Sequence, residues 1–226
     1  MIIQPTKLQG IYETIKGKRK ALLTINLSPG KKVYDESLIK EKGIEYRDWN
    51  PKKSKLAAAI IKGVSQIGIK PESTVLYLGC ASGTTCSHVS DIVGKNGFVF
   101  AVDFAPRVMR EMVFVCEQRS NIMPIMADAN NTESFEKYIT IVDTVFQDIA
   151  QKQQAEIFLK NCGKFLKKRG FGLLSVKARS IDVAKKPKLV FQEIREKLEK
   201  ELVIVDYRTL EPFELDHCMF ICKKIK

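Results

Sequence analysis

Residues 74–85 have the types and spacing of a cofactor-binding turn. The apolar run at residues 75–78 is typical of a strand buried on both faces, and Gly79 and Gly83 follow it where the chain must turn. Asp103 comes twenty residues after Gly83, the offset at which an acidic residue accepts hydrogen bonds from ribose hydroxyls in doubly wound folds. This combination favours a nucleotide-like ligand, whereas the glycines alone would also suit an ordinary strand-to-helix turn.

The glycine spacing indicates a cofactor without phosphate groups. Gly79 and Gly83 are four positions apart, so the turn lacks the G-x-G-x-x-G pattern that binds a pyrophosphate. S-adenosylmethionine suits this turn because it carries a methionine where a nucleotide carries its phosphates. A nicotinamide-dependent dehydrogenase is the remaining enzyme class, and the same spacing is the main objection to it.

Lys55, Asp148 and Lys177 are candidates for the chemistry of methyl transfer. Two lysines and a carboxylate in one pocket are costly to bury unless they act together. A sugar hydroxyl attacks a sulfonium methyl group poorly without help, so Lys177 would take or steer its proton. Asp148 would hold Lys177, and Lys55 would add positive potential that favours the developing alkoxide. The alternative for each residue is a surface salt bridge.

Other polar residues directly follow predicted strands, where ligands bind in open α/β sheets, but their assignments are weaker. Asp128 and Ala129 follow a predicted strand, where the carboxylate suits an adenine amino group and the small side chain leaves room for the ring. A helix cap is an equal alternative for Asp128. His88 is expected to be a packed, hydrogen-bonded histidine. His217 begins the last strand beside Asp216, a position that alone gives little support for catalysis.

Alternating strands and helices must position these residues. Predicted strands span residues 74–79, 98–103, 122–126, 143–147, 171–176, 202–208 and 217–223. Predicted helices span residues 84–93, 106–118, 132–140, 152–167 and 187–200, after a first helix from Ser54 to near Gly68. Such alternation produces a mostly parallel sheet, and the short connection at 209–214 makes the last two strands an antiparallel hairpin. We therefore expect an α/β fold of the Rossmann-like, S-adenosylmethionine-dependent methyltransferase type, with a seven-stranded sheet.

Residues 1–53 differ in pattern from the rest of the chain. Short apolar runs such as residues 21–27 are separated by Ser28-Pro29-Gly30 and Lys42-Gly43, which is typical of short strands and turns. The sequence predicts a small β-rich N-terminal domain over residues 1–53 and the methyltransferase domain over residues 54–226.

The charge of the chain favours a polyanionic partner. With 38 lysines and arginines against 26 aspartates and glutamates, the formal net charge is +12. Basic residues cluster at positions 16–20, 52–55, 167–169 and 185–188. Together the clusters favour RNA as a partner, although each cluster alone would suit a solvated surface.

The cysteines, histidines and hydropathy exclude several classes of protein. The six cysteines form no Cys-x-x-Cys pair and only two histidines are present, so we expect reduced thiols and no zinc site. The first ten residues lack the apolar run of a secretory signal, and no stretch approaches the roughly 20 apolar residues of a membrane span. We expect a cytoplasmic protein without membrane contact.

Five segments of the chain resemble fibrillarin, the 2′-O-methyltransferase of box C/D guide ribonucleoproteins. They are TVLYLGCASGTTCSHVSDIVG from Thr74, WNPKKSKLAAAI from Trp49, DIAQ at 148–151, VKARSID at 176–182 and LEPFELDH at 210–217. They span nearly all of the predicted methyltransferase domain. The N-terminal module is similar to that of archaeal fibrillarins, and this sequence lacks the glycine- and arginine-rich extension of the eukaryotic proteins.

The resemblance implies cofactor contacts and a catalytic set. The residues that would contact S-adenosylmethionine are Gly79, Thr84, Thr85, Asp103, Phe104, Asp128, Ala129, Asp148, Ile149, Ala150 and Gln151. The catalytic residues would be Lys55, Asp148, Lys177 and His217, with no metal ion.

The resemblance also implies RNA substrates and several partners. A box C/D guide RNA would select the target ribose by base pairing, so this protein need not read the sequence and its basic surface would follow the RNA backbone. Pre-ribosomal RNA is the expected target and transfer RNA an open second one. The implied protein partners are a Nop-domain scaffold protein and a kink-turn-binding ribosomal-type protein.

Three positions depart from the family pattern. Cys80 stands where alanine is usual, Asp103 where glutamate is common, and Lys152 where proline usually follows the DIAQ segment. Asp103 reaches one methylene less far toward the ribose, and none of the three departures removes a catalytic group. Two other functions fit the same sequence, namely a stand-alone RNA methyltransferase that needs no guide and a catalytically silent RNA-binding structural subunit.

Overall fold

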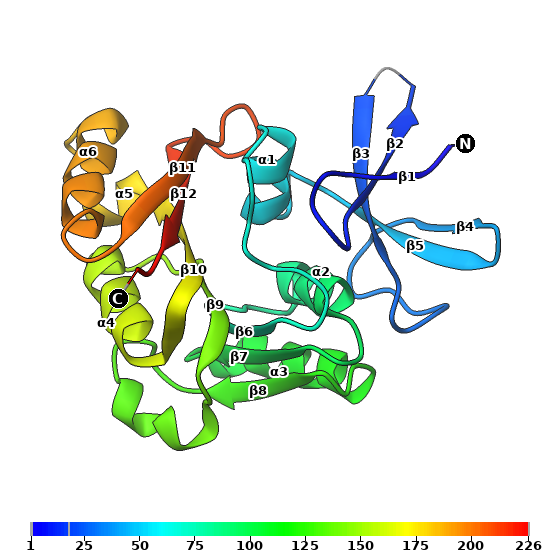
Figure 1. Ribbon diagram of the computed structural model, residues 1–226, viewed down its shortest axis with the longest axis horizontal. Helices are drawn as coiled ribbons and strands as arrows, with labels where there is room; N and C mark the ends of the chain where they lie inside the picture. Colours follow the sequence, from blue (N-terminus) through cyan, green and yellow to red (C-terminus); the bar gives the residue numbers. More distant parts are fainter. Residues whose placement is uncertain (1, 18, 226) are drawn as a thin grey trace.

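A mostly parallel sheet forms the centre of the computed structural model, which describes residues 2–17 and 19–225 (Figure 1). Lys18, in the first predicted basic cluster, lies outside these residues. The strands of the central sheet are β6 (Thr74–Leu78), β7 (Phe98–Asp103), β8 (Ile122–Met126), β9 (Val142–Gln147), β10 (Leu166–Lys177), β11 (Val203–Thr209) and β12 (His217–Lys223). Their order is β11-β12-β10-β9-β6-β7-β8.

The direction of the strands agrees with the sequence-based expectation. Strands β6 to β10 pair in parallel, while β12 pairs antiparallel with both β10 and β11. The predicted seven-stranded sheet with a C-terminal hairpin is therefore confirmed within the described residues. The carboxyl ends of the parallel strands meet at one edge, where ligands bind in open α/β sheets.

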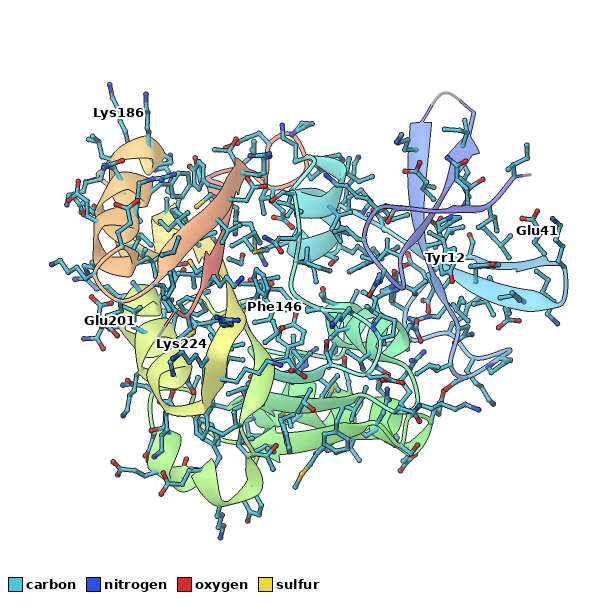
Figure 2. The ribbon with its side chains drawn as sticks, in the orientation of Figure 1. Tyr12, Glu41, Phe146, Lys186, Glu201 and Lys224 are labelled. Atoms are coloured by element: carbon cyan, nitrogen blue, oxygen red, sulfur yellow. The ribbon has the colours of Figure 1, made fainter. Side chains whose placement is uncertain are left out.

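Helices cover both faces of the central sheet. They are α1 (Lys55–Ile61), α2 (Thr84–Val93), α3 (Pro106–Glu117), α4 (Gln154–Phe165), α5 (Ala178–Ile181) and α6 (Pro187–Leu198). Alternate residues of each strand face opposite layers, so Tyr77 packs with α1, α2 and α3, while Leu76 packs with α4 and α6. Figure 2 shows Phe146, which faces the first layer, inside the molecule among the strands.

The N-terminal segment forms an antiparallel sheet of its own. Its strands are β1 (Gln4–Pro5), β2 (Tyr12–Lys16), β3 (Arg19–Ile25), β4 (Leu38–Glu41) and β5 (Ile44–Trp49), in the order β1-β2-β3-β5-β4. Figure 1 shows this sheet beside α1 and α2, at the right of the view. Strand β5 ends at Trp49 and α1 begins at Lys55, and a domain boundary after residue 53 stays a prediction.

A buried histidine helps to join the N-terminal sheet to α2. His88 is fully buried, stacks on Trp49 with ring centroids 4.9 Å apart, and hydrogen-bonds through its two ring nitrogens with Thr24 and Tyr34. The prediction of a packed, hydrogen-bonded histidine is therefore confirmed. Burial first, and then the positive charges of Arg47 and Arg119, lower the pKa of His88 well below its usual value.

Buried ion pairs join the same two elements. Arg47 of β5 donates to Glu36 at 2.7 Å and to Asp91 of α2 at 2.8 Å, and Arg119 also pairs with Asp91. The side chains of Arg47, Glu36 and Asp91 have no exposed surface. Removing one partner would leave an uncompensated buried charge, so this network fixes the N-terminal sheet against α2.

Some predicted elements were wrong in type or length. The helix expected at 132–140 is two 3₁₀ turns, η1 (Thr132–Ser134) and η2 (Glu136–Tyr138), because the buried Phe135 interrupts the helical backbone between them. The first helix ends at Ile61 and not near Gly68, since Gly63 follows in a left-handed conformation. Strand β10 begins five residues earlier than expected, directly after α4 and through an irregularity in its pairing with β9.

The cysteines have the expected state. All six are free thiols, and only Cys116 is partly exposed. Within the described part of the chain, no helix combines the length and apolar character that a membrane crossing needs.

Candidate active site

The turn after β6 brings three strand ends close together. Gly79 has a φ of +83°, and a Cβ atom there would lie 2.4 Å from the carbonyl oxygen of Asp148 and 2.8 Å from Cγ2 of Ile149. The amide of Gly79 donates to the carbonyl of Val102, at the end of β7, over 2.8 Å. Only glycine allows this close approach with this backbone conformation.

A pocket of about 250 Å³ opens at this turn, at the carboxyl ends of β6, β7, β8 and β9. It is lined by Gly79, Ala81, Val102, Asp103, Phe104, Ala127, Ala129, Asp148, Ile149, Ala150 and Gln151. Eight of the eleven predicted cofactor contacts are therefore brought together here. Ala81, Val102 and Ala127 were missed, although each lies within two positions of a predicted residue and has a small or apolar side chain.

Three predicted cofactor contacts do not line this pocket. The Thr85 hydroxyl is buried and donates to the Ser54 hydroxyl over 3.0 Å, and Thr84 begins α2 beside it. The Asp128 side chain is exposed and accepts from the amide of Asn130 at 2.9 Å, which closes an Asx turn. The alternative of a helix cap at Asp128 was wrong, because the next 3₁₀ turn begins at Thr132 and its N-cap is Asn131. Contact of these three residues with a cofactor stays a prediction.

The Asp103 carboxylate is held in place by the backbone. It accepts hydrogen bonds from the amides of Ala81, at 3.0 Å, and Ala105, at 3.1 Å. A carboxylate has about four acceptor positions, so two remain for the hydroxyl groups of a ligand. The turn after β6 and the end of β7 thus orient this carboxylate toward the pocket that it lines.

The charge of the pocket lining fits a cationic ligand and not a polyphosphate. Asp103 and Asp148 are both in the lining, which contains no lysine or arginine. A sulfonium ion is attracted to such a lining, whereas a pyrophosphate would meet two carboxylates and find no cation. Phe104 is 62% exposed and lines the pocket, so a planar base can cover its ring. These features fit S-adenosylmethionine and argue against a dinucleotide.

Lys55 and Asp148 form an ion pair beside this pocket. The Nζ atom of Lys55 lies 3.1 Å from the Asp148 carboxylate, and both side chains are mostly buried. Lys55 is the first residue of α1, whose amino end is capped by Ser54, and Ser54 in turn accepts from Thr85. The start of α2 therefore positions the start of α1, and through it the lysine.

The predicted pairing of Asp148 with Lys177 was wrong. Among the described residues, the ion-pair partner of Asp148 is Lys55, whereas the Lys177 side chain is exposed. The reason is positional: Lys177 ends β10 three residues beyond Leu174, the register partner of Gln147, so it lies farther along the sheet than Asp148. The ammonium group of Lys177 is consequently available to a ligand.

The sheet nevertheless brings the predicted catalytic residues to one face. Side chains alternate between the two faces of a strand, and Phe146 and Leu173 face the layer that contains α1. Asp148 lies two positions after Phe146, and Lys177 lies four positions after Leu173, so both point to the same face. His217 pairs directly with Lys177 in the β10–β12 register. The carboxyl edge therefore collects these side chains on the face where α1 supplies Lys55.

Local hydrogen bonds orient Lys177 and His217. Gln154 accepts from the Lys177 amide at 3.2 Å and donates to its carbonyl at 3.4 Å, which fixes the end of β10. The Nδ1 atom of His217 lies 2.6 Å from the carbonyl oxygen of Leu215, so Nδ1 carries a proton and donates. In the neutral ring, Nε2 is then a hydrogen-bond acceptor.

Two nearby groups are inert. Burial first, and then the negative charge of Asp148, raise the pKa of the Tyr77 phenol well above its usual value. Burial and the charge of Asp103 likewise raise the pKa of the Cys80 thiol. Both groups stay protonated at neutral pH and serve packing. Across residues 2–17 and 19–225, no cluster of three or more histidine, cysteine or carboxylate groups could hold a metal ion.

Comparison with known proteins gives a consistent result over the whole chain. A family model described as fibrillarin matches residues 2–226. The fibrillarin-like rRNA/tRNA 2′-O-methyltransferase of Thermococcus onnurineus is 51% identical over 226 residues, which cover 99% of this chain and 100% of that protein.

Three solved structures are similar in fold and sequence. The fibrillarin pre-rRNA processing protein of Methanococcus jannaschii has a TM-score of 0.95 and 48% identity, over 99% of this chain and 97% of that one. Aeropyrum pernix fibrillarin, solved with natively bound S-adenosyl-L-methionine, has a TM-score of 0.91 and 40% identity, over 98% of both chains. A chain of a fibrillarin/Nop5p complex has a TM-score of 0.87 and 34% identity, over 96% of this chain and 99% of that one.

Proposed function

The chain belongs to the fibrillarin family, and from this premise we propose that it is an RNA-guided ribose 2′-O-methyltransferase. It transfers a methyl group from S-adenosylmethionine to a ribose 2′-hydroxyl of RNA. The single observation that carries the proposal is the pocket at the carboxyl edge, which is lined by two carboxylates, lacks cations and adjoins the Lys55–Asp148 pair.

The pocket residues would hold the cofactor. Asp103 has two free acceptor positions for the ribose hydroxyls, and Phe104 offers an apolar ring to the base. Residues 148–151 and Ala129 supply the rest of the wall. When bound, S-adenosylmethionine supplies a methyl group activated by a positively charged sulfur.

The catalytic residues act on the attacking hydroxyl. We assign the removal of the hydroxyl proton to the amine form of Lys177 or to Nε2 of His217, since each has a free lone pair that accepts the proton. In its ammonium form, Lys177 donates to the hydroxyl oxygen and steers it. Asp148, held by Lys55 at 3.1 Å, accepts a hydrogen bond and orients the hydroxyl. The positive charge of Lys55 offsets the negative charge that develops on the oxygen. These roles deepen the sequence-based assignment and replace its Asp148–Lys177 pair by an Asp148–Lys55 pair.

The substrates and partners follow from the family. The relatives are named for ribosomal and transfer RNA, and one was solved in complex with Nop5p, so we propose both RNA classes as targets and a Nop-domain protein as scaffold. A box C/D guide RNA and a kink-turn-binding ribosomal-type protein complete the proposed assembly. The net charge of +12 suits a protein that lies against RNA backbone. A cytoplasmic location belongs to the same proposal.

The Lys177→Ala variant tests the catalytic assignment. Methyl transfer in the complete assembly should fall about 10²- to 10⁴-fold, the usual contribution of a general acid or base. Cofactor affinity, measured by calorimetric titration, should change less than threefold because Lys177 does not line the cofactor pocket. Lys152→Ala removes a neighbouring exposed lysine and should leave both quantities unchanged. Lost cofactor binding with retained transfer would refute the assignment.

Activity without a guide would distinguish the second candidate function. A stand-alone RNA methyltransferase would modify its substrate in the absence of guide RNA and partners. A silent structural subunit would bind the cofactor and RNA but transfer no methyl group in any mixture.

A further inference from the structure

A second large depression lies at the edge of the sheet opposite the active site. It has a volume of about 570 Å³ and is lined by residues 7–9 and 66–70, Ser73, Asp143 and residues 167–171. We call it the amino-edge groove, since it adjoins the first residues of β6 and β9 and the first half of β10. Along β10, Phe171 in the groove and Lys177 at the active site are six residues apart, or about 20 Å.

The groove is strongly basic. Its lining contains the five cations Lys7, Lys70, Lys167, Lys168 and Arg169, against the single carboxylate of Asp143. These cations come from three separate segments of the chain, and only the last three were recognised as a cluster from the sequence. This composition is the reverse of the cofactor pocket, which contains carboxylates and no cations.

Asp143, the one carboxylate of the groove, already has partners within the protein. Asp143 accepts from the Thr74 amide at 2.7 Å and pairs with Lys167. Burial alone would raise the pKa of Asp143, but the hydrogen bonds from Lys167 and Thr74 hold it below its usual range. In the described part of the chain, none of the ion pairs involves the other four cations of the groove, Lys7, Lys70, Lys168 and Arg169. Their charge is available to a ligand.

A fixed bulge presents the cations of β10. Arg169 has a φ of +63°, and the pairing of β10 with β9 is irregular between Leu166 and Phe171. Lys224 fixes the bulge, because its carbonyl accepts from the Arg169 amide and its amide donates to the Gly170 carbonyl. Figure 2 shows Lys224 at this end of β10 and β12, well below Lys186 near the opposite end.

The floor between the cations is apolar. Leu8, Ile67, Ile69 and Phe171 contribute to the lining. Phe171 packs on Gly68, where a Cβ atom would lie 2.2 Å from the Phe171 Cβ and 2.4 Å from its ring atom Cγ, so the absence of a side chain at Gly68 leaves space for Phe171. Fixed cations around apolar surface suit a ligand that is anionic on one side and less polar on the other, as a nucleic acid strand is.

We propose that the amino-edge groove binds the backbone of RNA at a place that does not contact the reacting ribose. Lys70, Lys168 and Arg169 contact phosphates, while sugars or bases cover Phe171. The choice of RNA among polyanions rests on the proposed function. The groove and the active site together would then hold two parts of one folded RNA about 20 Å apart.

Two matched triple variants of the full chain test this site. The groove variant combines Lys70→Gln, Lys168→Gln and Arg169→Gln. The control combines Lys42→Gln, Lys95→Gln and Lys200→Gln, three exposed lysines outside the groove, and therefore removes the same charge. Each protein is titrated with a fluorescently labelled RNA duplex with single-stranded ends over a series of salt concentrations.

The groove variant should bind this RNA at least tenfold more weakly at low salt. Its plot of log affinity against log salt should be shallower than that of the wild type by about two to three, since each lost phosphate contact removes roughly 0.7 to 0.9 from the slope. The control should stay within threefold of the wild type. Ultraviolet cross-linking of wild-type protein should attach RNA to residues 167–171, a readout that does not depend on the folding of any variant.

Other outcomes would overturn the proposal. Equal effects of the two triple variants, or cross-links that avoid residues 167–171, would show that the groove does not bind RNA. Loss of Nop-domain protein binding with unchanged RNA binding would assign the groove to a protein partner instead. Groove-dependent RNA binding by a protein that transfers no methyl group would refute the proposed function and leave the groove proposal standing.

Discussion

Substitution of Gly79 by alanine should damage the active site more than the fold. The new Cβ atom would lie 2.4 Å from the Asp148 carbonyl oxygen and 2.8 Å from Ile149, whereas ordinary contacts begin near 3.4 Å. The segment that carries Asp148 would have to move by about 1 Å. That movement would stretch the 3.1 Å contact of Asp148 with Lys55 and widen the cofactor pocket.

The magnitude follows from two costs. A side chain at a φ of +83° costs about 1–2 kcal/mol, and overpacking adds about 1–3 kcal/mol. We expect a loss of about 3 kcal/mol in the free energy of unfolding, which for a chain of this size lowers the thermal midpoint by about 6–12 °C. Because a 1 Å misplacement of a reacting group costs about 10²-fold in rate, methyl transfer should fall about a hundredfold.

Gly63→Ala is the matched control. Gly63 has the same φ of +83°, but nothing lies within 4 Å of its Cβ position. This variant should lose only the backbone cost of about 1–2 kcal/mol and keep its activity. Differential scanning calorimetry gives the stabilities, and transfer of labelled methyl groups at saturating RNA gives the rates. If the two variants lost equal stability and both remained active, contact between Gly79 and Asp148 would not control the site.

Other substitutions test the electrostatics. Arg47→Met leaves Glu36 buried without its partner, so it should cost about 3–5 kcal/mol and lower the calorimetric midpoint; a loss below about 1 kcal/mol would contradict the buried network. Because the pKa of His88 is depressed, its contribution to stability is complete above about pH 6.5 and is lost as the pH falls below it, at up to about 1.4 kcal/mol per unit. In urea unfolding between pH 5 and 6.5, the free energy of unfolding of His88→Gln should depend less on pH than that of the wild type. An unchanged dependence on pH would refute this assignment. Asp103→Asn should weaken cofactor binding about tenfold in calorimetric titration, and unchanged affinity would remove Asp103 from the site.

The parts of the site that the sequence predicted are those with strong local signals. The strand before Gly79, the glycine turn and the strand that ends at Asp103 lie close together in the chain, and each has a distinct residue pattern. The carboxyl-edge rule then placed Asp148 and Lys177 near the turn, since parallel strands end together. The strand register and the alternation of side chains along each strand then put the catalytic candidates on one face of the sheet.

The parts that the sequence could not predict depend on distant contacts. Lys55 was a candidate from the sequence, but its direct pairing with Asp148, 93 residues away, was not predicted because that pairing depends on the packing of α1. Arg47 and Asp91 look like ordinary surface charges in a strand and a helix, yet they are buried together between the N-terminal sheet and α2. Lys70 has no basic neighbour in sequence, so its convergence with the β10 bulge emerges only from the fold.

The most direct measurement is methyl transfer from labelled S-adenosylmethionine to a target RNA, with and without a matching guide RNA and the two partner proteins, followed by mapping of the modified ribose. The account predicts methylation at one guide-specified 2′-oxygen and only in the complete mixture. Transfer by the isolated protein would contradict the guided function, and absence of transfer in every mixture, despite verified cofactor binding and an active control assembly, would contradict catalysis itself.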